Sequence, residues 1–124
     1  MITLKTLPQA TAQEVFDQIT QHLLQQGKAA KSTTGDCRYR VEVQGEILRC
    51  AAGCLIADNE YAEDSLEGRS WGLLVSNRTI PKKHCELIKS LQNVHDTCSV
   101  REWPKQFERL ARCYKLQYNP PQPS

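Results

Sequence analysis

Apolar residues recur at every third or fourth position between residues 12 and 26, which is the spacing of one face of an α-helix. The members of this face are Val15, Phe16, Ile19 and Leu23. Thr11 and Glu14 have the spacing of a capping box at the start, and Gly27 supplies a C-cap. The pattern therefore predicts a helix over 12–26, followed by a polar loop over 28–36.

Apolar and charged residues alternate from residue 37 to residue 43, which predicts a β-strand with one buried face. The inward positions are Cys37, Tyr39, Val41 and Val43, and the outer positions are Arg38, Arg40 and Glu42. A turn at 44–46 and a return at 47–49 complete a β-hairpin. Residues 51–56 then predict a short helix and residues 58–70 a loop. The apolar stretch 71–76 fits either a strand or a helical turn.

Two further helices are predicted in the second half of the chain. Pro81 suits the first position of a helix over 82–95. The stripe of that helix consists of His84, Leu87, Ile88, Leu91, Val94 and His95. Ser99 and Glu102 form a second capping box before the last helix. One face of the last helix carries Trp103, Phe107, Leu110, Ala111 and Tyr114.

These elements predict a single α+β domain over residues 1–118, with three main helices packed on a β-hairpin and a short helix after it. Residues 119–124 are predicted to be a flexible, proline-rich tail. The expected core consists of Val15, Phe16, Ile19, Leu23, Tyr39, Val41, Leu48, Leu55, Ile56, Leu87, Ile88, Leu91, Phe107, Leu110 and Ala111. Four or more strands, or the absence of the helix over 82–95, would contradict this prediction.

Composition narrows the class of protein. The formal net charge of +2 is too small to argue for nucleic-acid binding by charge alone. No apolar run approaches the roughly 18–20 residues that cross a membrane. Residues 1–8 contain no apolar signal core, so we expect a cytoplasmic protein. In that compartment its six cysteines stay reduced.

Four short motifs give the chain a recognisable pattern. They are Cys37-x-Tyr39-Arg40, then Cys50-Ala51-Ala52-Gly53-Cys54-Leu55-Ile56-x-Asp58-x-Glu60-Tyr61, then Glu67-Gly68, and finally Leu91-Gln92-x-x-His95-Asp96. The pattern resembles a family of small uncharacterised proteins encoded by phages, prophages and some bacteria. The resemblance covers most of the chain from residue 37 to residue 114. It implies a phage-related accessory role and no particular activity.

The segment after Ile56 is strongly acidic. Asp58, Glu60, Glu63, Asp64 and Glu67 lie close together in the sequence, and there is no Lys or Arg among them. Clustered carboxylates repel one another, so they suit either a solvated loop or a docking surface for a basic partner. We predict that a host protein with a basic surface binds here, through Asp58, Glu60, Tyr61, Glu63, Asp64 and Glu67.

A thiol- or zinc-dependent enzyme is the alternative. Its candidate residues are Cys37, Cys50, Cys54, His84 and His95. The Cys-x3-Cys spacing of Cys50 and Cys54 lacks the second ligand pair that structural zinc sites usually show. Asp96 adjoins His95 on a predicted helix, so we expect the two side chains to point in different directions. A weaker alternative is a nucleotide-like ligand bound at a helix start near Gly53.

Several other chemistries are excluded or disfavoured. The chain has no phosphate-binding glycine loop, and no Asp follows Asp96 to complete a His-Asp phosphohydrolase set. The last helix carries a basic stripe made of Arg101, Lys105, Arg109 and Arg112. No aromatic stacking platform accompanies the stripe, so specific nucleic-acid binding is not expected. We expect no cofactor. The favoured function is a non-enzymatic binder that modulates or inhibits a host macromolecule.

Overall fold

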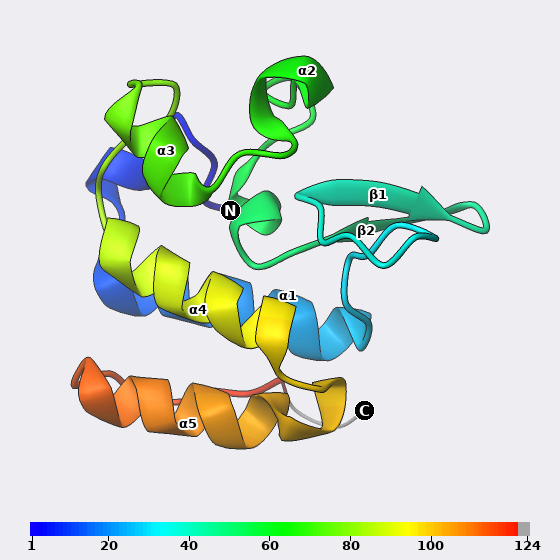
Figure 1. The fold of residues 1–124 in the computed structure, drawn as a ribbon. Coiled ribbons are helices and arrows are strands. Elements are labelled where there is room, and N and C mark those ends of the chain that lie inside the picture. The colour runs from blue at the N-terminus through cyan, green and yellow to red at the C-terminus, as the bar shows by residue number, and fades with distance from the viewer. Residues whose placement is uncertain (122–124) are drawn as a thin grey trace.

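The computed structural model describes residues 1–121 and confirms the α+β class. The elements are η1 (Leu7–Gln9), α1 (Ala12–Gln26), β1 (Arg40–Val43), β2 (Glu46–Arg49), η2 (Ala52–Leu55), α2 (Glu63–Leu66), α3 (Trp71–Ser76), α4 (Cys85–Thr97), η3 (Val100–Glu102) and α5 (Trp103–Cys113), where η marks a 3₁₀-helix. The helices α1, α4 and α5 pack on one another, and the hairpin projects from one side of them (Figure 1).

The predicted helix over 12–26 is confirmed as α1. The Thr11 hydroxyl accepts a hydrogen bond from the Glu14 backbone N–H at 3.1 Å, and the Glu14 carboxylate accepts one from the Thr11 N–H at 2.8 Å. Gly27 ends the helix in the left-handed conformation, with φ of 67°. The second capping box, between Ser99 and Glu102, is also formed.

The helix predicted over 82–95 exists as α4, but its start is shifted. Pro81 is not at the first helical position, because α4 begins at Cys85. His84 has a positive φ of 59° and acts as the N-cap, so the helical path cannot run back through it. The prediction for Pro81 was therefore wrong, and His84 lies before the apolar stripe instead of on it.

The predicted hairpin is confirmed, with a shorter first strand and a second strand that begins one residue earlier. Val43 pairs with Glu46, so the loop contains only Gln44 and Gly45. Both have positive φ, 51° and 79°, as a type I′ turn requires. β1 starts later than the predicted residue 37 because Cys37 forms an isolated bridge with Lys31.

The chain between the hairpin and α4 is more helical than predicted. The loop predicted over 58–70 contains the single turn α2. The stretch 71–76, for which the sequence left strand and helix open, is the helix α3, and Ser70 caps it by accepting the Leu73 N–H at 3.1 Å. The short helix η2 contacts α1, α4 and β2, so it joins the hairpin to the helices.

The predicted core is buried except for two residues, Val41 and Leu110, which are half-buried. The prediction missed apolar residues that stand outside the long periodic runs: Leu7, Ala30, Leu66, Trp71, Leu74 and Ile80. These residues belong to short helices and loops, which are too short to show a periodic signal.

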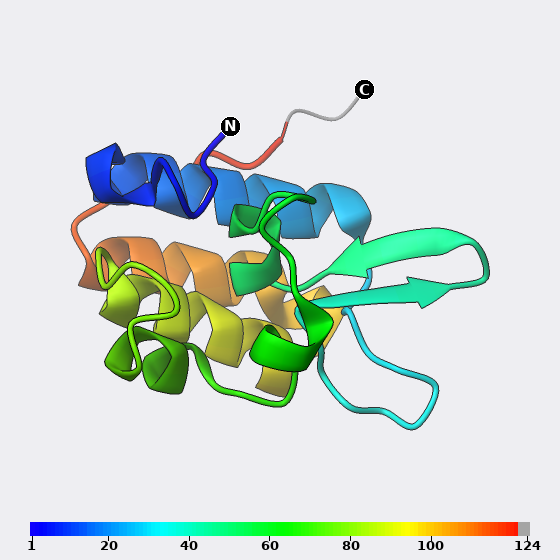
Figure 2. The same ribbon diagram turned by 90° about the horizontal axis from the view of Figure 1, so that it is seen from above.

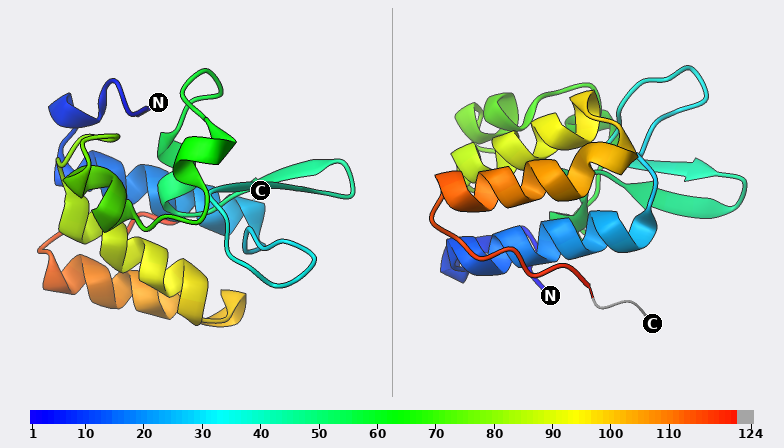
Figure 3. Two further views of the ribbon diagram at one scale, coloured as in Figure 1. Left: turned by 45° about the horizontal axis from the view of Figure 1, so that its top comes forward. Right: turned by 90° about the horizontal axis from the view of Figure 1, so that it is seen from below.

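The C-terminal segment runs along α1 (Figure 3). The side chain of Gln13 makes two hydrogen bonds of 2.9 Å with the backbone of Gln117, and Gln21 donates to the carbonyl of Asn119, also at 2.9 Å. The rest of the predicted tail, residues 122–124, lies outside the described residues. Within residues 1–121, no helix has the length and apolar character needed to span a membrane.

Candidate functional site

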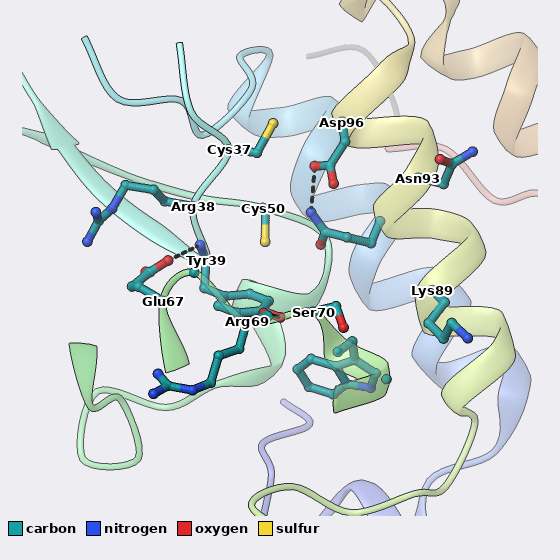
Figure 4. Close-up of a pocket in the computed structure, with 14 residues that line it drawn as sticks. Cys37, Arg38, Tyr39, Cys50, Glu67, Arg69, Ser70, Lys89, Asn93 and Asp96 are labelled. Carbon is teal, nitrogen blue, oxygen red and sulfur yellow. Dashed lines mark hydrogen bonds between the residues drawn. The ribbon is translucent and has the colours of Figure 1, made fainter. Parts of the chain in front are cut away.

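A cavity of about 450 Å³ lies between the chain entering β1, the segment after α2, and α4. Its lining residues are Cys37, Arg38, Tyr39, Cys50, Glu67, Gly68, Arg69, Ser70, Trp71, Gly72, Lys89, Gln92, Asn93 and Asp96. Figure 4 shows Cys37, Cys50 and Asp96 close to one another at this site. Segments that are far apart in the sequence therefore meet here.

His95 and Asp96 form the polar centre of the site. His95 is fully buried, and its Nδ1 lies 2.8 Å from Oδ1 of Asp96. The same oxygen accepts a hydrogen bond from Gln92 at 2.7 Å. The expectation that His95 and Asp96 point in different directions was wrong. Nδ1 of His95 and the carboxylate of Asp96 both lie close to the helix backbone. They can therefore meet although neighbouring helix positions point in different directions.

The hydrogen bonds of His95 leave it no free nitrogen. Its Nε2 accepts the backbone N–H of Ala30 at 2.9 Å, so this nitrogen carries no proton. The proton of the neutral ring is therefore on Nδ1, which donates it to Asp96. His95 can act neither as a general base nor as a metal ligand without losing one of these bonds.

The hydrogen bonds of His95 argue against a zinc ion at this site. Ligand atoms of Cys37, His95 and Asp96 lie within 4.8 Å of one another, which is a spacing that could surround a metal ion. A ligating histidine normally donates its second N–H to an acceptor. Here the second nitrogen faces another N–H donor, so the donor set does not fit a metal centred on these residues.

The thiols are in environments that disfavour the thiolate. Burial raises the pKa of Cys54 to about 12 and also raises the pKa of Cys50 above its usual range. Burial and then the negative charge of Asp96 raise the pKa of Cys37. A protonated thiol is a poor nucleophile and a poor metal ligand, so these environments disfavour the chemistry of a thiol enzyme.

The five residues predicted for a thiol or metal site lie in different parts of the structure. Cys37, Cys50 and His95 lie at or beside the cavity. Cys54 lines a different hollow together with His22. His84 Nε2 bonds to the carbonyl oxygen of Ala10 at 2.7 Å. The five residues therefore do not form one cluster.

Two glutamates of the acidic segment bind the backbone. The Glu60 carboxylate accepts the N–H groups of Leu4 and Lys5, both at 3.0 Å. The Glu67 carboxylate accepts those of Tyr39 and Arg40, also at 3.0 Å, and Tyr61 donates its hydroxyl to Glu67 at 2.7 Å. These two carboxylates face inward and tie separate segments together.

The other carboxylates of the segment meet the hairpin. Asp58 pairs with Arg40 at 3.0 Å and with Arg49 at 3.2 Å. Glu63 pairs with Arg38 at 2.6 Å. The side chain of Arg40 is only 16% exposed, so the outer face of the hairpin is partly covered at this residue. Sequence reasoning found no cation inside the acidic segment and did not foresee these three arginines.

The remaining members of the predicted partner-binding set differ in access. The guanidinium carbon of Arg40 lies 4.5 Å from the ring centre of Tyr61, which is half-buried. Asp64 is exposed, and among residues 1–121 it has no ion pair within 4.0 Å. Contact with a partner stays a prediction for these residues. Asp58, Glu63 and Asp64 are the carboxylates that solvent reaches.

The surroundings of Gly53 do not favour the predicted anion site. A Cβ atom at Gly53 would lie 2.0 Å from the carbonyl oxygen of Tyr39, so the backbone is tightly packed at this point. The N–H of Ala52 bonds to Gln92 at 2.9 Å, and the N–H of Gly53 points to the Cys50 sulfur at 3.3 Å. These contacts leave little room for a ligand at Gly53 and occupy the N–H groups of Ala52 and Gly53.

Some cavity residues carried no functional signal in the sequence. Gln92 and Asp96 are four residues apart, which places both on one side of a helix and could have identified their contact. Ser70 ends the loop that was predicted over 58–70, and Trp71 begins the stretch whose secondary structure the sequence did not decide. Lys89 comes from the exposed side of α4.

No protein-family model, curated protein or solved structure matches this chain. The resemblance to phage and bacterial proteins therefore remains a prediction from the four motifs.

Proposed function

We propose that this chain is a non-enzymatic binding protein that holds a macromolecule with a basic surface and thereby modulates or inhibits it. The main support comes from the hydrogen bonding of His95 and the protonation of the thiols at the cavity. Both nitrogens of His95 are hydrogen-bonded inside the protein, and the nearby thiols favour the protonated form. Groups held in this way support recognition better than catalysis.

The shape of the acidic segment supports the choice of partner. Glu63 and Asp64 form the first turn of α2, and the following residues, from Glu67 to Gly72, form a wall of the cavity. Figures 1 and 2 show α2 beside the base of the hairpin. Exposed carboxylates and a cavity are therefore contiguous, which suits a partner that offers cationic side chains.

The phage-type role has separate support. It rests on the motif resemblance, which covers residues 37–114. A small protein that inhibits a host macromolecule needs only one complementary surface.

Charge reversal on α2 tests the proposal. Asp64→Lys should abolish capture of basic proteins from a bacterial lysate, because it places like charges across the interface. The matched control is Glu108→Lys on α5, which makes the same change of charge on a different helix. Thermal melting should show that both variants remain folded, since Asp64 and Glu108 are exposed.

The readout is mass spectrometry of the proteins retained by immobilised wild type and by each variant. The proposal predicts that the set retained by wild type and by Glu108→Lys is missing from Asp64→Lys. Equal retention by all three proteins would contradict it.

A further inference from the structure

Asp96 is a half-buried carboxylate at the cavity without a cationic partner. Its side chain is 35% exposed, and among residues 1–121 no Lys or Arg nitrogen lies within 4.0 Å of it. Burial opposes its charge, but hydrogen bonds from His95 and Gln92 outweigh burial and lower the pKa of Asp96. Buried charges in proteins are ordinarily paired, and Asp96 is removed from water only in part.

The hydrogen bonds of Asp96 leave capacity for a further donor. Both of the bonds from His95 and Gln92 go to Oδ1. Oδ2 is left as an acceptor, and the weak thiol donor of Cys37 lies close to the carboxylate. A charged N–H donor would bond more strongly to this oxygen than a neutral one.

The cations at the rim of the cavity are directed to other partners. Arg38 pairs with Glu63 at 2.6 Å, and Lys89 lies 3.5 Å from Glu86. Arg69 donates to the carbonyl oxygen of Asp64 at 2.8 Å. In Figure 4 the ends of Arg38 and Arg69 extend away from Asp96. None of them neutralises the carboxylate.

The walls suit the hydrocarbon part of a ligand. Tyr39 and Trp71 meet edge to face with their ring centres 6.2 Å apart, and both contribute to the lining with Cys50. Aromatic and sulfur atoms pack well against a methylene chain, and an aromatic ring also attracts a nearby cation. The cavity volume of about 450 Å³ falls in the range of ligand sites.

We infer that this cavity accepts one cationic nitrogen group, an alkylammonium or a guanidinium, against the carboxylate of Asp96. The inference rests on the proposed binding function and deepens it, because a Lys or Arg side chain of the basic partner would be the anchor. Free amines and guanidines share this chemistry.

Titration of the wild-type protein with small defined probes tests the inference. The charged probes are N-acetyl-lysine amide, N-acetyl-arginine amide and butylamine, and the neutral probe is N-acetyl-norleucine amide. Binding is followed by calorimetry and by chemical-shift changes at Asp96 and its neighbours. The charged probes should bind, the neutral one should not, and Asp96→Asn should lower the affinity about 10- to 100-fold.

The matched control is Asp36→Asn, which removes an exposed carboxylate outside the cavity lining and should leave the affinity unchanged. Tighter binding of the two amino-acid amides than of butylamine would assign the anchor to a protein side chain. Equal binding of the amides and butylamine would assign the site to a small amine. Both results support binding of a cationic nitrogen group at Asp96. The charged and neutral probes are compared on the wild-type protein, so this comparison does not depend on whether Asp96→Asn folds.

Three results would overturn the inference. They are no binding of any charged probe to wild type, equal binding of the neutral probe, and unchanged binding to folded Asp96→Asn. Each is distinct from failure of the proposed function, which is judged by protein capture with Asp64→Lys. If Asp64→Lys loses capture but no charged probe binds to wild type, the proposed binding function is supported and the cationic anchor at Asp96 is contradicted.

Discussion

Single side chains hold the non-helical segments of this protein in place. Glu60 fixes the N-terminal segment and Glu67 fixes the start of β1, each by accepting two consecutive backbone N–H groups. A carboxylate can do this because its two oxygens are spaced for neighbouring donors. In this segment, acidic residues that look alike in the sequence have different roles in the structure.

The first prediction compares two of these glutamates. Glu67→Ala should lower the free energy of unfolding by about 2–4 kcal/mol, because it leaves two half-buried N–H groups and the Tyr61 hydroxyl without an acceptor. Glu63→Ala removes only an ion pair whose carboxylate is 65% exposed, and should change stability by less than about 1 kcal/mol. Urea unfolding of both variants measures the difference. Equal losses would refute the structural role of Glu67.

A second prediction uses two glycines. Gly53→Ala should destabilise the fold strongly, since its Cβ would lie 2.0 Å from a backbone oxygen that cannot easily move. At Gly72 the nearest atom to a new Cβ is the Lys89 nitrogen at 3.7 Å, an ordinary contact. Gly72→Ala in α3 should therefore be neutral or stabilise by up to about 1 kcal/mol. Thermal melting separates the outcomes, and a stable Gly53→Ala protein would contradict the packing.

The third prediction concerns pH. Burial, aided by the charge of Arg49, lowers the pKa of His22 from its usual 6.5, although the bond to the Arg49 carbonyl acts in the opposite direction. As pH falls, His22 is protonated near pH 6.5 in the unfolded chain, whereas in the folded protein it is protonated only at a lower pH. The stability that His22 contributes is present above that pH and is lost as pH falls toward the folded pKa.

Replacing the histidine checks this pH dependence. His22→Gln should lose less stability than wild type between pH 7 and pH 5, as measured by urea unfolding at each pH. An identical loss in the two proteins would show that other groups cause the dependence.

At the scale of elements, η2 connects the two halves of the fold. It contacts α1, α4 and β2, and its Leu55 is fully buried. Leu55→Ala should cost about 2–5 kcal/mol through the cavity that it leaves. Leu73→Ala on α3, where the residue is 50% exposed, should change stability by less than about 0.5 kcal/mol. Urea unfolding tests the pair, and equal losses would contradict the anchoring role of η2.

The elements that could be predicted from sequence are those with local signals. The capping box at Thr11 and the 3.6-residue repeat identify α1, and the alternating pattern followed by a turn that contains Gly45 identifies the hairpin. The start of α4 could not be placed, because the left-handed conformation of His84 depends on its tertiary contact with Ala10.

At the scale of the whole molecule, the candidate site depends on distant segments that meet. The hydrogen bond from Ala30 to His95 spans 65 residues, and those from Tyr39 and Arg40 to Glu67 span 28 and 27. Residue types singled out Cys37, Cys50 and His95, which lie at or beside the cavity, but they gave no information on the protonation states or hydrogen-bond partners of these residues. Those properties come from burial and from backbone donors, which no short motif encodes.

The central claim is that the protein acts by binding and that its thiols take no part. The most direct test is a Cys37→Ser, Cys54→Ser variant, compared with wild type for retention of the basic partner and for zinc by elemental analysis. The account predicts equal retention by both proteins and no stoichiometric zinc in either. Loss of retention in the variant, together with one zinc per wild-type chain, would contradict it.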